Sequence, residues 1–215
     1  MKFNLSEEQI LVRDAAREFA QTELLPDVIE RDELQKFPHN LVKKMAELGF
    51  MGIMVDPKYG GSGMDTLSYA LVMEELSKVD ASASVIVSVN NSLVCFGLEA
   101  YGTEKQKEKY LIKLATGEWI GAFCLSEPEA GSDATSQSTT VVNKGDHYLL
   151  NGTKNWITNG GRAQVYLVIA QTDKNKGYKG IDVFIVERDT PGFEIGPKEN
   201  KLGIRGSDTH TLQFN

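Results

Sequence analysis

The chain has 215 residues, of which 41% are hydrophobic and 25% are charged, and its formal net charge is −7. A chain of this length and composition buries enough apolar surface to fold as a globular protein. Its acidic balance, without any block of like charges, argues against nucleic acid as a partner.

The sequence also indicates where in the cell the protein is expected. The N-terminus is polar and runs directly into an amphipathic pattern, so no signal peptide is predicted, and no stretch approaches the ~20 apolar residues of a membrane helix. Cys95 and Cys124 lie far apart in apolar surroundings, which is typical of reduced, buried thiols rather than of a disulfide framework. We therefore expect a cytoplasmic protein that does not enter a membrane.

The first half of the chain has helical periodicity. A capping box at Ser6 and Gln9 predicts the start of a first helix, which Pro26 bends or interrupts. Pro38 opens a second helix, and Gly49 ends it in the left-handed conformation. Further helices are predicted over residues 66–79, 82–100 and 103–115. The helix over residues 82–100 is nearly uncharged, and we expect it to be central in its domain.

Past Gly117 the period changes to two, which is typical of β-strands. Strands are predicted over residues 148–150, 165–171, 182–187 and 211–214. Hairpin turns are expected at Asn151-Gly152 and at residues 144–146. Helices followed by strands predict an α+β multidomain protein rather than a Rossmann fold, with an all-α N-terminal domain (residues 1–116) and a β-barrel or sandwich middle domain (residues 117–215).

Two segments have the composition of a ligand site. The first, at residues 121–133, reads GAFCLSEPEAGSD. It leaves a strand and becomes a loop in which Pro128 cannot pair within a sheet and Gly131 lets the backbone approach a ligand closely. A β-turn whose Ser and Asp side chains satisfy their own backbone is the alternative interpretation.

The second segment, at residues 151–161, reads NGTKNWITNGG. Trp156 is placed to cover one face of a planar ring, with the hydroxyl of Thr158 at the edge of that ring. A core Trp and an ordinary strand Thr are the alternative, because Trp is usually buried and Thr favours strands.

Taken together, these segments resemble the two flavin-binding signatures of the acyl-CoA dehydrogenase family. The resemblance extends along the chain through YGGSG, EEL, YGTEKQK, TPGF and KLGIRGSDT, which begin at residues 59, 74, 101, 190 and 201. The chain is identified as similar to the N-terminal and middle domains of short-chain, butyryl-CoA dehydrogenase-like members. The family's C-terminal helical bundle domain is expected to be missing from these residues.

The resemblance implies that FAD is the cofactor. The residues implied to contact it are Phe123, Cys124, Leu125, Ser126, Gly131, Ser132, Trp156, Ile157 and Thr158. Ser126 would donate to the pyrimidine end of the flavin, the Thr158 hydroxyl would lie near flavin N5, and Ser132 would also touch the acyl-CoA substrate. Ser126 stands where the family more often has Thr, and Glu129 stands where Gly or Asn is common.

The implied reaction is oxidation of an acyl-CoA to the trans-2-enoyl-CoA. A carboxylate removes the α-proton while the β-hydrogen passes to flavin N5 as hydride. The carboxylate is expected from the C-terminal domain, so no catalytic residue is assigned, and Glu127 is given no proton-transfer role. Electrons would pass to an electron-transfer flavoprotein, and the full-length protein would be a homotetramer in fatty acid metabolism.

Residues 88–95 resemble short-chain members and favour a short or branched acyl group, with ordinary core packing of two satisfied Asn side chains as the alternative. His39, His147 and His210 lack ligand spacing, so no metal site is predicted. An acyl-CoA oxidase and a non-catalytic flavin- or CoA-binding scaffold are the rival functions. The 215 residues alone are expected to bind FAD weakly and to be inactive.

Overall fold

The structure, a computed structural model, describes residues 4–215 and divides them into two compact units. The first unit runs to Trp119 and also takes in Lys201–Ser207. The second comprises Ile120–Asn200 and Asp208–Asn215. Nothing in the local sequence pattern indicated that residues 201–207 leave the β unit and belong to the helical one.

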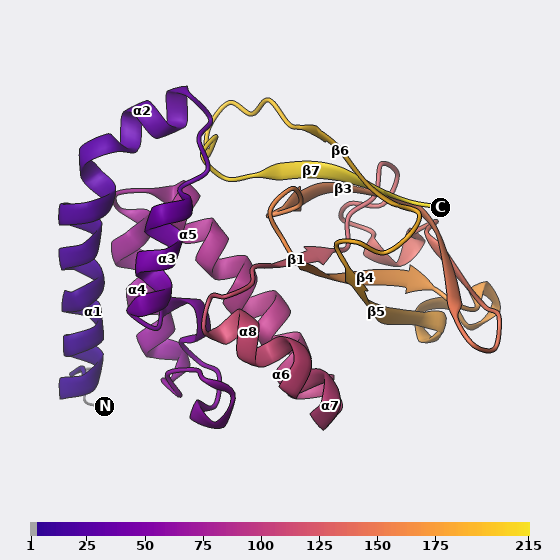
Figure 1. Cartoon of the computed structure of the whole chain (residues 1–215), viewed down its shortest axis with the longest axis horizontal. Helices are drawn as coiled ribbons and strands as arrows, with labels where there is room; N and C mark the ends of the chain where they lie inside the picture. The colour runs from indigo at the N-terminus through magenta and orange to yellow at the C-terminus, as the bar shows by residue number, and fades with distance from the viewer. Residues whose placement is uncertain (1–3) are drawn as a thin grey trace. The chain divides into compact units, whose positions relative to one another are not determined.

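The first unit is built from helices (Figure 1). Its α-helices are α1 (Glu7–Phe19), α2 (Val28–Glu33), α3 (His39–Glu47), α4 (Thr66–Ser77), α5 (Ala81–Ser88), α6 (Phe96–Tyr101), α7 (Glu104–Gln106) and α8 (Ile112–Ala115). The π-helical turns η1 (Ala20–Leu24), η5 (Val89–Cys95) and η6 (Lys107–Leu111) extend α1, join α5 to α6 and join α7 to α8. The short 3-10 turns are η2 (Leu25–Asp27), η3 (Phe50–Gly52) and η4 (Pro57–Tyr59).

The predicted helix signals are confirmed in this unit. Ser6 and Gln9 form a reciprocal capping box, in which the Gln9 amide donates to Ser6 Oγ at 3.2 Å and the Ser6 amide donates to Gln9 Oε1 at 3.0 Å. Pro26 lies in η2, the 3-10 turn that follows η1 and interrupts the helix, because proline cannot donate the helical hydrogen bond. Gly49 follows α3 with φ 76°, the left-handed conformation that a glycine adopts without steric cost.

A continuous helix of 21 residues, Ala81–Tyr101, runs through the first unit, and its most apolar window has a mean hydropathy of 1.5. By length and composition it could cross a membrane, so the expectation that no stretch approaches this character is wrong. More than half of that window, 56%, is buried inside the protein, and Ile86, Val87 and Val94 are fully buried. This is the burial of a core helix, which was predicted to be central.

The second unit is a curled sheet (Figure 1). Its strands are β1 (Gly121–Cys124), β2 (Thr140–Asn143), β3 (Tyr148–Thr158), β4 (Val165–Gln171), β5 (Ile181–Glu187), β6 (Phe193–Lys198) and β7 (Thr209–Phe214). The strand order is β1-β4-β2-β3-β7-β6, with β5 paired to β4. The pairs β1/β4 and β2/β4 are parallel and the others are antiparallel. Two 3-10 turns, η7 (Ala134–Ser136) and η8 (Lys174–Gly180), lie in the connections.

One predicted turn is confirmed and the other is wrong. Residues 144–146 connect β2 to β3, and the Lys144 amide donates to the His147 carbonyl at 2.9 Å. Asn151-Gly152, in contrast, lies inside β3. A Cβ on Gly152 would lie 2.7 Å from the Cα of Thr139, so this glycine serves the close approach of the preceding segment rather than a turn.

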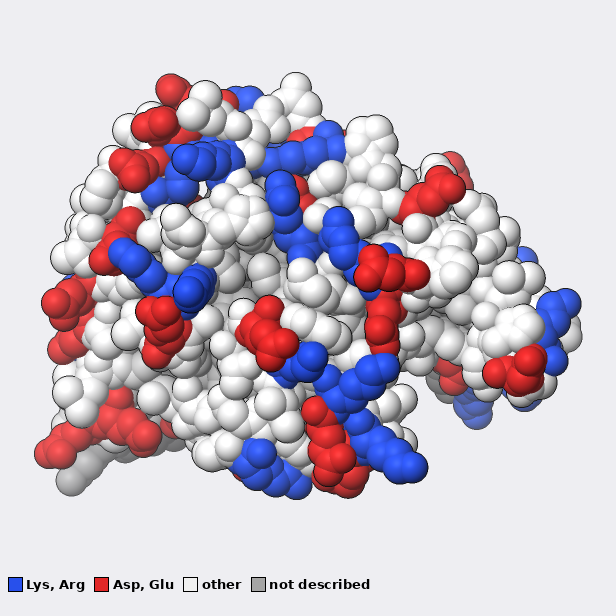
Figure 2. Space-filling view, in the orientation of Figure 1, with Lys and Arg blue, Asp and Glu red and all other residues white. Residues whose placement is uncertain are grey.

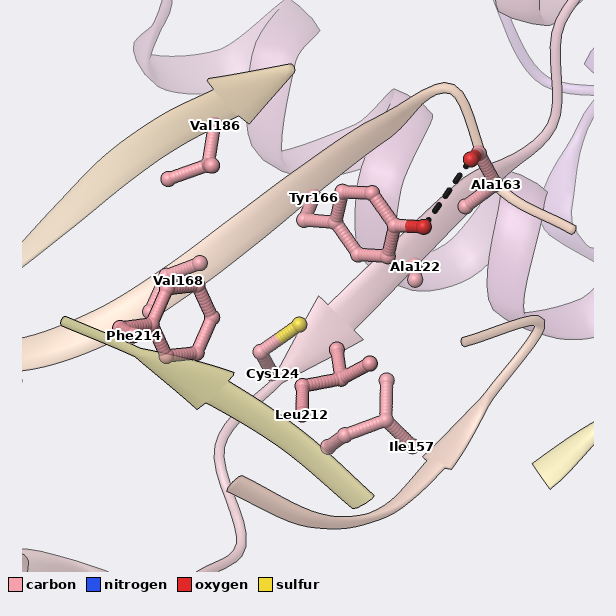
Figure 3. Close-up of a cluster of buried hydrophobic side chains, with 9 residues drawn as sticks. All are labelled: Ala122, Cys124, Ile157, Ala163, Tyr166, Val168, Val186, Leu212 and Phe214. Carbon is pink, nitrogen blue, oxygen red and sulfur yellow. Dashed lines mark hydrogen bonds between the residues drawn. The ribbon is translucent and has the colours of Figure 1, made fainter. Parts of the chain in front are cut away.

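The core of the second unit lies between the curled strands. Figure 3 shows its buried cluster, in which Cys124 from β1, Ile157 from β3 and Leu212 from β7 point toward one another. Tyr166 of β4 is also fully buried, and its hydroxyl donates to the Ala163 carbonyl at 3.0 Å. The helical unit followed by the β unit confirms the predicted α+β class. Cys95 and Cys124 are free and buried, as predicted.

Candidate functional site

The fold brings the two candidate segments together. The loop after β1 runs beside β3, and the Asn155 amide donates to the Ser126 carbonyl at 2.8 Å. Glu127 and Ala130 form an isolated β-bridge that turns the loop back at Pro128 and Glu129. Ser126 and Trp156, predicted as ligand contacts from separate motifs, therefore lie on adjoining stretches of backbone.

The predicted contact residues differ in what they expose. Trp156 is 62% exposed. Phe123, Leu125, Ser126 and Thr158 are half-buried, whereas Gly131 and Ser132 lie on the exposed part of the loop. Cys124 and Ile157 are buried in the hydrophobic core. The hydroxyls of Ser126, Ser132 and Thr158 and the indole of Trp156 are therefore at least partly accessible.

Trp156 has an unusual backbone. Its φ is 62°, a conformation that costs a bulky residue about 1–3 kcal/mol and persists only where the surroundings impose it. The cause is a β-bulge: Lys154 pairs with Leu212, but Ile157 pairs with His210, so β3 carries one residue more than β7 over this interval. The bulge lets the indole project outward while Ile157 enters the core.

Beneath the bulge lies a buried ion pair that the sequence analysis did not anticipate. Lys154 Nζ donates to Glu127 Oε1 at 2.7 Å, and the two side chains are 0% and 1% exposed. The same ammonium donates to the Leu125 carbonyl and to Gln137 Oε1, each at 3.0 Å. A lysine ammonium has three donors, and all three are used.

Glu127 is held as a carboxylate by its neighbours. Its Oε2 accepts from the amide and hydroxyl of Ser138, and Oε1 accepts from the Thr139 amide at 3.1 Å. Burial by itself raises the pKa of Glu127, but the hydrogen bonds from Lys154, Thr139 and Ser138 outweigh it and lower the pKa to about 2. Burial lowers the pKa of Lys154 from its usual value, and the contact with Glu127 opposes that shift. Because Glu127 is fully committed to these donors, it is poorly suited to proton transfer.

The turn after β3 is fixed by polar contacts. Asn159 has φ 63° and its side-chain amide donates to the Gly121 carbonyl at 3.1 Å. The Tyr166 hydroxyl donates to the Gly160 carbonyl at 2.8 Å, and the Gly161 amide donates to Asp208 Oδ2 at 2.8 Å. These contacts hold the backbone that carries Thr158.

The residues present fit a flavin. A planar heterocycle requires a flat apolar platform and hydrogen-bond donors at its polar edges, and Trp156, Ser126 and Thr158 supply these groups. Nothing lies within 4 Å of a Cβ built on Gly131, so a ligand can approach that backbone closely.

On the face that Figure 2 shows, acidic and basic side chains are intermixed rather than gathered by sign.

Two domain families of known proteins match this chain, one over most of each unit. Residues 6–118 match the N-terminal domain of acyl-CoA dehydrogenases, and residues 122–215 match the middle domain. The short-chain specific acyl-CoA dehydrogenase of Clostridium acetobutylicum is 51% identical over 214 residues, which cover 100% of this chain and 56% of that protein. The chain thus spans about half the length of the curated relatives it matches.

Solved structures agree with the assignment. Butyryl-CoA dehydrogenase from Megasphaera elsdenii superposes with a TM-score of 0.95 at 45% identity, covering 100% of this chain and 57% of that one. A glutaryl-CoA dehydrogenase from Mycobacterium smegmatis in complex with FADH2 gives a TM-score of 0.92 at 38% identity, covering 98% of this chain and 53% of that one. This chain belongs to the acyl-CoA dehydrogenase family.

Proposed function

We propose that the protein takes part in the FAD-dependent oxidation of a short-chain acyl-CoA to the trans-2-enoyl-CoA. The observation that carries this proposal is the junction at which the Asn155 amide binds the Ser126 carbonyl and joins the two flavin signatures. Bound FAD supplies a hydride acceptor for the β-hydrogen. Short-chain relatives at 51% identity and a relative solved with FADH2 support the substrate class and the cofactor.

In this proposal, the residues of this chain bind and orient FAD and the acyl-CoA. When FAD is bound, Trp156 would cover a face of the ring, the Ser126 hydroxyl would donate to its polar end, and the Thr158 hydroxyl would lie at its reacting edge. Ser132, on the exposed part of the loop, would donate to the acyl-CoA. The carboxylate that accepts the α-proton is not assigned to any of these residues, since Glu127 is occupied by Lys154, Ser138 and Thr139.

The test is an anaerobic titration of the full-length protein with butyryl-, isovaleryl- and octanoyl-CoA, followed through the visible absorbance of the flavin. We expect butyryl-CoA or isovaleryl-CoA to bleach the flavin and octanoyl-CoA to do so poorly. A bound flavin that none of them reduces would contradict the proposed reaction and favour a non-catalytic scaffold.

The electron acceptor and assembly belong to the same proposal. We expect reduced protein to be reoxidised quickly by an electron-transfer flavoprotein and slowly by oxygen. Rapid reoxidation by oxygen would instead identify an acyl-CoA oxidase. Light scattering of the full-length protein should give the mass of a homotetramer. The free, buried Cys95 and Cys124 are consistent with the proposed cytoplasmic location.

A further inference from the structure

The buried ion pair formed by Lys154 and Glu127 joins the two flavin-binding segments close to Ser126 and Trp156. Glu127 directly follows Ser126, and Lys154 lies two residues before Trp156. The two ionic groups meet at 2.7 Å although their residues are 27 positions apart in the chain. The ion pair therefore connects the backbone next to Ser126 with the backbone next to Trp156.

The bulge makes this linkage necessary. Trp156 has φ 62°, and the register with β7 is interrupted between Lys154 and Ile157. Ile157 is held on one side of the bulge by the core. On the other side the anchor is Lys154, whose ammonium is bound to acceptors from Leu125, Glu127 and Gln137. A bulged residue remains in a strained conformation only where both flanks are fixed.

The Lys154 ammonium determines the orientation of the Gln137 side-chain amide. Gln137 Oε1 accepts from Lys154 at 3.0 Å. Its Nε2 is buried and has no hydrogen-bond partner among the described residues. Leaving a buried donor unpaired is costly, and the opposite orientation of the amide would turn that donor toward a cation. The cationic side chain thus fixes Gln137 and the loop that carries it.

We infer that Lys154, acting through Glu127 and Gln137, is a positioning residue that sets Trp156 relative to Ser126 for flavin binding. This inference rests on the proposed FAD-dependent function. It assigns no proton transfer to either member of the pair. Its direct consequence is that the bulge, and hence the indole, moves when the ion pair is removed.

The test uses the full-length protein in a Trp119→Phe background, so that Trp156 is the reporter among the tryptophans of the described residues. We compare Lys154→Met and Glu127→Gln with the double variant, and with Ile169→Ala as a control for general destabilisation. Ile169 is buried in β4 and pairs with β5, away from the bulge. If Lys154→Met does not fold, Glu127→Gln, which keeps the side-chain volume, takes its place in every comparison.

Two readouts are expected to change together. In the apoprotein, the emission maximum and acrylamide quenching of Trp156 should shift in Lys154→Met but not in Ile169→Ala. In the FAD-loaded protein, flavin reduction by substrate should slow by about 100-fold, the effect of misplacing a reacting group by about 1 Å. The double variant should be no worse than the more damaging single variant, because the residues act as one unit.

The outcomes separate the inference from the function it rests on. A wild-type protein that binds no FAD would overturn the proposed function. The positioning role alone would be overturned by a different result. The wild-type protein would bind FAD that substrate reduces, and Lys154→Met would be destabilised like Ile169→Ala but keep the Trp156 emission and the rate of flavin reduction.

Discussion

The side chain of Asn91 holds the turn at Phe50. Its Oδ1 accepts from the Ile53 amide at 2.7 Å, and its Nδ2 donates to the Phe50 carbonyl at 2.8 Å. The neighbouring Asn90 donates to the carbonyls of Met51 and Leu114. Both Asn side chains lie in the segment that suggested a short acyl substrate, and both have structural partners, as the alternative interpretation expected.

Replacing Asn91 with Ala should therefore lower stability and leave the preference for acyl length unchanged. Two buried backbone groups would lose their partner, at about 1–3 kcal/mol each. Denaturant unfolding measures the first effect, and rates of flavin reduction with butyryl- and octanoyl-CoA measure the second. A changed ratio of those two rates would place Asn91 among the residues that select the substrate.

Gly152→Ala should destabilise the second unit. The added Cβ would overlap Thr139 Oγ1, and the glycine has φ 154°. Overpacking of this kind costs about 1–3 kcal/mol, and the backbone conformation adds to it. The urea midpoint should fall accordingly. Gly203→Ala is the control, since nothing lies within 4 Å of the point that its added Cβ would occupy, and its midpoint should stay at the wild-type value.

Acid should weaken the protein through Glu127. The pKa of this carboxyl is lowered to about 2 in the folded state, against about 4.3 when unfolded. The stabilisation is fully present above the unfolded pKa and is lost as the pH falls from about 4.3 toward 2, a change of about 3 kcal/mol. Urea midpoints measured across this range should show a shallower fall in Glu127→Gln than in wild type. Identical pH profiles would show that Glu127 does not carry the effect.

Thr158→Val tests the hydroxyl at the end of β3. If the hydroxyl binds the flavin, its loss should remove one hydrogen bond worth about 1–3 kcal/mol and slow the reductive half-reaction. Stopped-flow bleaching of the flavin is the measurement. Thr172→Val is the control, because that hydroxyl lies after β4 and binds the Gly180 carbonyl at 2.9 Å and Asp182 Oδ2 at 2.6 Å. An unchanged bleaching rate in Thr158→Val would mean that Thr158 does not face flavin N5.

Both thiols should be unreactive in the native protein. Burial raises the pKa of Cys95 and of Cys124 above the usual value, and both side chains are fully buried. A thiol reagent reacts with the thiolate, so Ellman's reagent under mildly alkaline conditions should modify them only after denaturant is added. Rapid reaction of either thiol without denaturant would show local opening around it.

The sequence predicted features that depend on neighbouring residues. The end of α3 at Gly49 and the turn at residues 144–146 follow from short-range chemistry. The bounds of β4, Val165–Gln171, agree with the strand predicted from a period of two, although β4 is buried throughout rather than on alternate residues. Asn151-Gly152 has the local signal of a turn, but pairing of β3 with both β2 and β7 overrides it.

The candidate site was predicted as a set of residues but not as an arrangement. The motifs identified Ser126 and Trp156, yet the backbone of Trp156 depends on a bulge against β7, which follows much later in the chain and has no local signature. Similarly, Lys154 and Glu127 are joined only by tertiary structure. A lysine in a strand is ordinarily expected at the surface, so its burial could not be read from the strand pattern.

The return of Lys201–Ser207 to the helical unit has a consequence for synthesis of the chain. The Arg205 amide donates to Asp32 Oδ1 across 173 positions of sequence, and Gly206 lies against Ser82. Domains generally fold in order as they leave the ribosome. Here the helical unit, whose helices are made first, receives these contacts only after nearly all of the β unit has been translated. The contacts of residues 201–207 with the helical unit can therefore form only after β6 has been translated.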